Sequence, residues 1–138
     1  MTDILKSQTV LVASTNDTTG QTVQVSNCQS LTLTITAAVS AATLSATVRL
    51  CGTNDDTLAL NPSSTLPTLN TGAAITVAPA EIVYDDATGL LTFTNPAIGT
   101  HEVTLAFSSF PKWVRPVYDY TSGGGTVDLR VVIGAWSV

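Results

Sequence analysis

Hydrophobic and polar residues alternate along most of the chain in short runs, which is the pattern of half-buried β-strands. The clearest run is 29–36, where Leu31, Leu33 and Ile35 alternate with threonines. Segment 43–51 alternates in the same way and places Arg49 on the outer face. The same reasoning predicts further strands at 8–14, 21–26, 74–78, 81–84, 90–94, 102–107, 113–120 and 127–136. The last two are expected to form a hairpin around the glycine-rich segment 122–126.

Turn residues separate these runs at a spacing of roughly 8–12 residues, which is typical of an all-β domain. We predict a single-domain antiparallel β-sandwich of about eight to ten strands, with the architecture of a jelly roll. A closed barrel is the alternative that the pattern leaves open. The domain is expected to span 8–138, preceded by a flexible N-terminal arm, 1–7.

Two features interrupt the regular pattern. The stretch 52–71 has no clear period, and we expect a long loop there that covers a sheet edge or has a function of its own. Pro116 lies inside the predicted strand 113–120. Because proline cannot donate to the hydrogen-bond ladder, that strand is expected at an edge or a bulge.

Composition supports the strand pattern and adds information about the surface. Threonine is the commonest residue, and strong helix formers such as Glu, Lys and Met are scarce. Only 11% of the residues are charged, against about 25% in an average soluble domain. Since interface cores are depleted of charged residues, this favours a subunit that is packed against neighbours. A secreted domain with a surface rich in Thr and Ser is the alternative.

Charge and hydropathy argue against several classes of partner. The net charge is −5 and the five basic residues are dispersed, so nucleic acid is not expected as a direct partner. No segment approaches the length of about 18 apolar residues that a transmembrane helix needs, and the N-terminus does not resemble a secretory signal. We therefore expect no membrane partner and synthesis in the cytoplasm. Cys28 and Cys51 are expected as reduced thiols, with a single disulfide as the alternative.

Candidate catalytic and metal-binding residues are few. His101 is the only histidine, so a metal site with several histidine ligands cannot be built. The acidic pairs Asp55-Asp56 and Asp85-Asp86 lack the spacing of a calcium loop, and 85–89 is predicted to be a turn. Glycines 123–125 lack the Lys-Ser/Thr of a phosphate-binding loop. We predict that the protein is not an enzyme and holds no metal or cofactor.

Aromatic residues are concentrated near the C-terminus. We predict an interface formed by Trp113, Arg115, Tyr118, Tyr120 and Trp136, because aromatic and arginine side chains dominate association energies. The first alternative is that the same residues pack in the hydrophobic core. A row of rings that stacks on sugars, as in a carbohydrate-binding module, is the second.

The same region resembles known proteins. Lys112-Trp113-Val114-Arg115, then Tyr118, the segment 122–126 and the apolar strand 127–136 are similar to the end of small tailed-bacteriophage virion proteins. The group that the chain most resembles is the capsid cement, or decoration, proteins with jelly-roll folds.

The resemblance implies a structural protein on the capsid surface of a virion, made in the host cytoplasm. Such a protein clamps neighbouring major capsid proteins and stabilises the shell, and it is expected to form a homodimer or homotrimer. The arm 1–7 and the loop 52–71 are the segments expected to reach a neighbour. A carbohydrate- or receptor-binding β-module of a phage tail is the alternative function.

Overall fold

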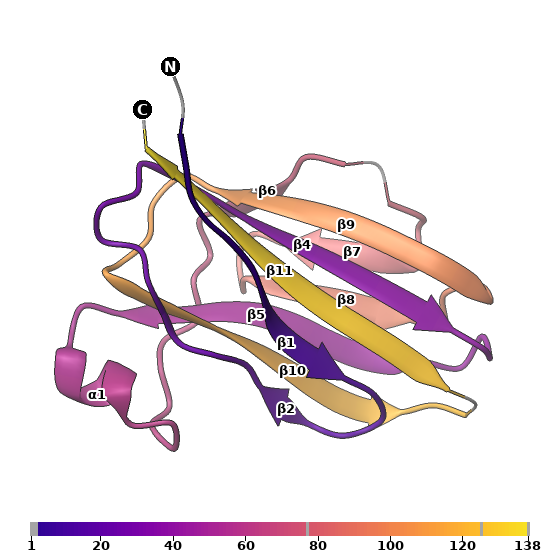
Figure 1. Cartoon of the computed structure of the whole chain (residues 1–138). Helices are drawn as coiled ribbons and strands as arrows, with labels where there is room; N and C mark the ends of the chain where they lie inside the picture. Colours follow the sequence, from indigo (N-terminus) through magenta and orange to yellow (C-terminus); the bar gives the residue numbers. More distant parts are fainter. Residues whose placement is uncertain (1–2, 77, 125, 138) are drawn as a thin grey trace.

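The computed structural model describes residues 3–76, 78–124 and 126–137 and consists of two antiparallel sheets packed face to face (Figure 1). The five-stranded sheet has the order β1-β11-β4-β9-β6, and the six-stranded sheet has the order β2-β10-β5-β8-β7 with β3 beside β10. The strands are β1 (Asp3–Ala13), β2 (Thr18–Thr19), β3 (Val23–Gln24), β4 (Ser30–Val39), β5 (Ser45–Thr53), β6 (Gly72–Ala74), β7 (Ile82–Asp85), β8 (Leu90–Thr94), β9 (Gly99–Phe107), β10 (Trp113–Ser122) and β11 (Val127–Ser137). A short helix, α1 (Asp56–Leu60), lies between β5 and β6. The predicted antiparallel sandwich is confirmed.

The strand order is that of a jelly roll, because the pairs are nested. β1 pairs with β11, β2 and β3 with β10, β4 with β9, and β5 with β8. The chain thus forms one long hairpin that is rolled up, which brings β11 beside β4 and β10 beside β5. The expected final hairpin is therefore wrong: β10 and β11 follow each other in the sequence but belong to opposite sheets.

The inward faces of the two sheets form a single hydrophobic core. In β4, Leu31, Leu33 and Ile35 are buried while the intervening threonines are partly exposed, as the alternation predicted. From the opposite sheet, Val48 of β5 and Phe93 of β8 are buried in the same core. Full burial of each such side chain contributes about 1.5–3 kcal/mol to the stability of the fold. Burial of the inward residues of the alternating strands is therefore a main driving force for folding.

Several boundaries differ from the expected ones. Residues 3–7 of the expected arm continue β1 and pair with β11, while residues 1–2 lie outside the described residues. The expected loop 52–71 starts with the end of β5 and contains α1. The expected strand 74–78 is shifted to β6, and residue 77 again lies outside the described part. Short β2 lies between the expected strands 8–14 and 21–26, where no strand was predicted. Thr18 and Thr19 form it by pairing with β10, a long-range contact.

Pro116 lies within the six-stranded sheet, in β10, and β10 is not an edge strand. In antiparallel pairing the N and O atoms of one residue face the same neighbour. The Pro116 carbonyl accepts a hydrogen bond from the Gly20 N–H at 2.8 Å, so the missing N–H also faces the gap between β2 and β3. A Cβ atom on Gly20 would lie 2.5 Å from the Val10 carbonyl oxygen. The proline is tolerated because pairing on this side is interrupted at a glycine.

Candidate functional site

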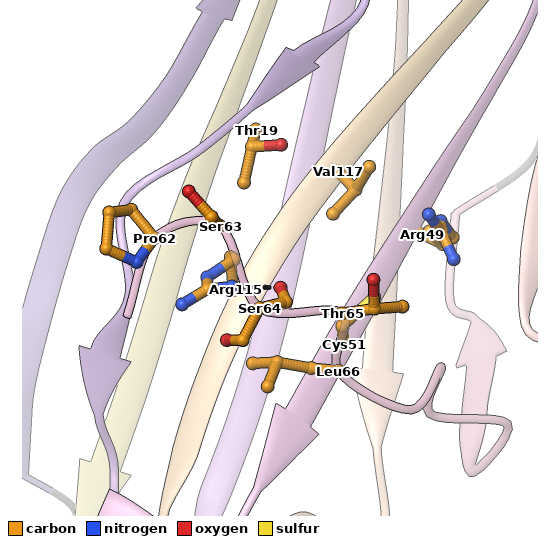
Figure 2. A pocket seen from close by; sticks show the side chains of 10 residues that line it. All are labelled: Thr19, Arg49, Cys51, Pro62, Ser63, Ser64, Thr65, Leu66, Arg115 and Val117. Carbon is orange, nitrogen blue, oxygen red and sulfur yellow. Dashed lines mark hydrogen bonds between the residues drawn. The ribbon is translucent and has the colours of Figure 1, made fainter. Parts of the chain in front are cut away.

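A cavity of about 250 Å³ lies on the outer face of the six-stranded sheet, under the segment that follows α1 (Figure 2). Its roof is the segment 62–66, and its floor belongs to β5 and β10. The side chains that line it, besides the roof, are Thr19, Arg49, Cys51, Arg115 and Val117. Arg49 and Arg115 point to this side because the neighbouring residues in each strand face the core.

Arg115 is buried, with 2% of its surface exposed, and binds four acceptors. Nε donates to Thr22 Oγ1 at 2.8 Å, and Nη1 donates to the Ser64 carbonyl at 2.9 Å. Nη2 donates to the carbonyl oxygens of Ala59 at 3.0 Å and Asn61 at 3.1 Å. Figure 2 shows the roof segment passing over this guanidinium group. Carbonyl dipoles at the end of α1 thus stabilise the buried charge, and no carboxylate of the described residues forms an ion pair with Arg115.

The start of α1 is held by residues 112 and 113, where β10 begins. Trp113 Nε1 donates to Asp56 Oδ1 at 2.7 Å, and Lys112 Nζ lies 2.9 Å from the same oxygen. These two contacts, the hydrogen bond from Lys112 first, hold the pKa of Asp56 below its usual value. Asp55 caps the helix, since its Oδ1 accepts from the Thr57 N–H at 2.9 Å. Residues 112–115 therefore fix α1 at both ends, and we call these contacts the α1 clamp.

Arg49 and Cys51 occupy the other side of the cavity. Arg49 Nη1 donates to Thr68 Oγ1 at 3.2 Å, and its Nε lies 3.3 Å from Asp119 Oδ2. Burial raises the pKa of the Cys51 thiol above its ordinary value. The protonated form is a poor nucleophile, so this buried thiol is suited to packing rather than to reaction. Cys28 and Cys51 are both free.

The predicted interface residues do not share one surface. Trp113 lies on the outer face of the six-stranded sheet, within the α1 clamp. Trp136 lies on the outer face of the five-stranded sheet, where its ring covers Gly134: a Cβ atom there would be 2.6 Å from Cη2 of the ring. Arg115 is buried in the α1 clamp, so it acts inside the chain.

The two tyrosines face the core. Tyr118 is fully buried, and its hydroxyl donates to the Ser14 carbonyl at 3.0 Å. Tyr120 is half-buried, and its hydroxyl donates to the Gly123 carbonyl at 2.8 Å. The four rings do not form the aligned row that sugar stacking requires. An interface role for Trp113, Tyr120 and Trp136, which are all partly exposed, stays a prediction.

The remaining polar candidates have local partners. His101 Nε2 lies 2.6 Å from the Ala97 carbonyl oxygen. Asp85 Oδ1 accepts from the Ala87 N–H at 2.9 Å, which is the expected turn. Among the described residues, no group of three His, Cys, Asp or Glu side chains is placed to hold a metal ion. Sequence reasoning missed α1; the signal was Asp55, a good N-cap, followed by an acidic residue in the first turn.

No family model, curated protein or solved structure matches this chain. In the part of the chain that the structure describes, no helix is long and apolar enough to cross a membrane. The function must therefore be argued from the geometry and from the chemistry of the surface.

We expect Arg115→Gln to lower the free energy of unfolding by about 2–4 kcal/mol, because three backbone carbonyl groups, that of the buried Ala59 among them, lose a charged donor. Urea denaturation measures this loss, and limited proteolysis should show faster cleavage within 56–66. The matched control is Arg130→Gln, at an exposed position of β11, which should stay within about 0.5 kcal/mol of the wild type. Equal stability and equal cleavage of the two variants would contradict the clamp.

Stability should fall as the pH rises from about 10 to about 12, in part because of Tyr118. Burial, with smaller contributions from Tyr120 and Asp17, raises the pKa of Tyr118 from 10.0 to about 12. The unfolded chain therefore loses this proton first, so the contribution is fully present below pH 10 and is lost by pH 12. Urea titrations should show the wild type more stable than Tyr118→Phe by about 1 kcal/mol at neutral pH. Through this window the wild type should lose stability that the variant keeps, so the offset shrinks and then reverses. Parallel curves would contradict the assignment.

Proposed function

We propose that the protein is a structural assembly subunit and that it packs the outer face of its five-stranded sheet against a neighbouring molecule. The observation that supports this is an uncharged patch on that face. Register pairs Thr34 with Thr104 and Val132, and Thr32 with Ala106 and Gly134. We define the uncharged face as Thr32, Thr34, Thr104, Ala106, Val132 and Trp136. The charged residues of the same strands lie beyond Thr34, toward the opposite end of the sheet; they are Glu102, Asp128 and Arg130.

The chemistry of the uncharged face suits a permanent contact. The hydroxyl groups of Thr34 and Thr104 bond to each other at 3.1 Å, so their burial leaves fewer polar groups without a partner. Threonine and valine are stiff at χ1, and stiff side chains lose little conformational entropy when a partner covers them. Trp136 adds a large ring of the kind that anchors interfaces.

The dimensions of the sheet are sufficient. Four long strands about 4.8 Å apart and about ten residues long, at about 3.3 Å per residue, give a face of roughly 600 Å² before side-chain relief is counted. A stable interface takes about 800 Å² of accessible surface from each partner. The whole outer face of this sheet, its charged end included, can therefore supply most of one interface.

Within this class we propose a capsid cement protein, which clamps neighbouring major capsid proteins and stabilises the shell of a virion. The resemblance of 112–136 to small phage virion proteins supports this assignment, and the jelly-roll strand order fits the same group. The partners in this proposal are the major capsid protein and further copies of this chain, in a homodimer or homotrimer. Repetition over a lattice then produces avidity from weak single contacts.

We expect native mass spectrometry at micromolar concentration to show a discrete dimer or trimer, and Thr34→Lys to convert it into a monomer. A lysine at the centre of the uncharged face places an unpaired charge in the contact. The control is Thr92→Lys, on the outer face of the six-stranded sheet, which should keep the oligomeric state of the wild type. Circular dichroism checks that both variants are folded. A monomeric wild type, or the same mass for all three proteins, would contradict self-association through this face.

We expect mass spectrometry of purified virions from the source of this sequence to find the chain in a simple ratio to the major capsid protein, because a cement subunit follows the lattice. Particles treated with mild denaturant should lose the protein before the shell breaks. A few copies per particle would instead indicate a tail or connector component, and its absence from virions would refute the capsid assignment.

A further inference from the structure

We propose that the cavity under residues 62–66, which Arg49 and Arg115 both line, binds a small oxyanion, a phosphate or a carboxylate. The cavity lies on the sheet opposite to the uncharged face, so this proposal is independent of the assembly function. The charge of the cavity, its free hydrogen-bond donors and its volume support the proposal.

The charge of the cavity is positive. Both arginines line it, and no carboxylate is among its described lining residues. Asp119 lies 3.3 Å from Arg49 Nε, but its side chain is half exposed and compensates only one of the two charges. Arg115 is buried with neutral partners alone. The carbonyl dipoles stabilise this charge without neutralising it, and an anion in the cavity would supply a counter-charge.

The donors of both arginines are only partly used. A guanidinium group has five N–H donors, and Arg115 uses four of them, which leaves one N–H on Nη1. On Arg49, Nη1 donates one hydrogen bond and Nε faces Asp119. The other Nη1 hydrogen and both Nη2 hydrogens have no bond among the described residues. Thr19, Ser63 and Thr65, which carry hydroxyl groups, also line the cavity. These free hydrogen-bond donors suit a ligand that has only hydrogen-bond acceptors, such as an oxyanion.

Both arginines line the same cavity from neighbouring strands. Arg115 pairs with Cys51, and Val117 pairs with Arg49, so the two arginines are diagonal neighbours on one face. Such neighbours are about 7–8 Å apart at their backbones, within reach of long side chains. The fork of a guanidinium group matches the oxygens of a phosphate or a carboxylate.

The volume selects a small ligand. At about 250 Å³, the cavity is smaller than the range of about 300–1,000 Å³ that drug-sized ligands occupy. It is large enough for a phosphate ion, for acetate or for an acidic side chain, and too small for a nucleotide.

Isothermal titration calorimetry with inorganic phosphate and, separately, with sodium acetate tests the proposal. Chloride keeps the ionic strength constant in all titrations. We expect saturable one-site binding of at least one of the two anions to the wild type and to Arg130→Gln, the matched control at an exposed arginine. Kd should be at least tenfold weaker for Arg49→Gln, which removes one charge and leaves the α1 clamp in place. If Arg49→Gln does not fold, Arg49→Lys replaces it and should also weaken binding, because lysine lacks the fork.

Each outcome bears on the proposal. Binding of phosphate alone identifies a tetrahedral oxyanion site, and binding of acetate identifies a carboxylate site that an acidic side chain can also fill. No saturable binding of either anion would overturn the proposal. Equal affinity in the wild type and the Arg49 variant would also overturn it, because binding would then take place elsewhere. The native mass of the same preparations reports separately on self-association, so failure of one proposal is distinguishable from failure of the other.

Discussion

The buried charge of Arg115 is the interaction around which the six-stranded sheet and its covering segment are arranged. A guanidinium group inside a protein needs dipoles in place of water. Arg115 finds them in residues far along the chain: Thr22 is 93 positions away, and the carbonyl groups of Ala59 and Ser64 are 56 and 51 positions away. One side chain therefore links β10, the segment after α1 and the stretch between β2 and β3. These contacts exist only after the hairpin has rolled up, so they report the completed fold.

The two outer faces of the sandwich consequently differ. The six-stranded sheet is covered in part by α1 and the segment behind it, which the α1 clamp holds in place. The outer face of the five-stranded sheet has no such cover among the described elements, and the centre of this face carries Thr, Ala and Val instead of charges. A covering segment over this uncharged face would shield it in the same way, and none of the described elements provides one. The asymmetry is understandable if a neighbouring molecule supplies the second cover.

Much of the fold could be predicted from the sequence, because alternation is a local signal. It placed β4 and β8 and put Arg49 on an outer face. Partner choice is not local: β10 and β11 are adjacent in sequence and separated by glycines, yet nested pairing puts them in opposite sheets. The five residues of α1 are too few to show a helical period. The role of Arg115 could not be predicted either, because its burial depends on a covering segment that only the folded chain brings into place.

The few basic residues of the chain are concentrated on one side of the sandwich. Three of the five basic residues, Arg49, Lys112 and Arg115, contact the segment that covers the six-stranded sheet or lie beneath it. There they hold the covering segment in place. They therefore contribute less to a charged, mixed surface of the kind that keeps free monomers soluble. Threonine provides the outer surface of β4 with hydroxyl groups that can pair with each other, as Thr34 and Thr104 do. Such a surface is hydrated when it is exposed and loses little free energy when it is covered, and both properties suit the proposed assembly subunit.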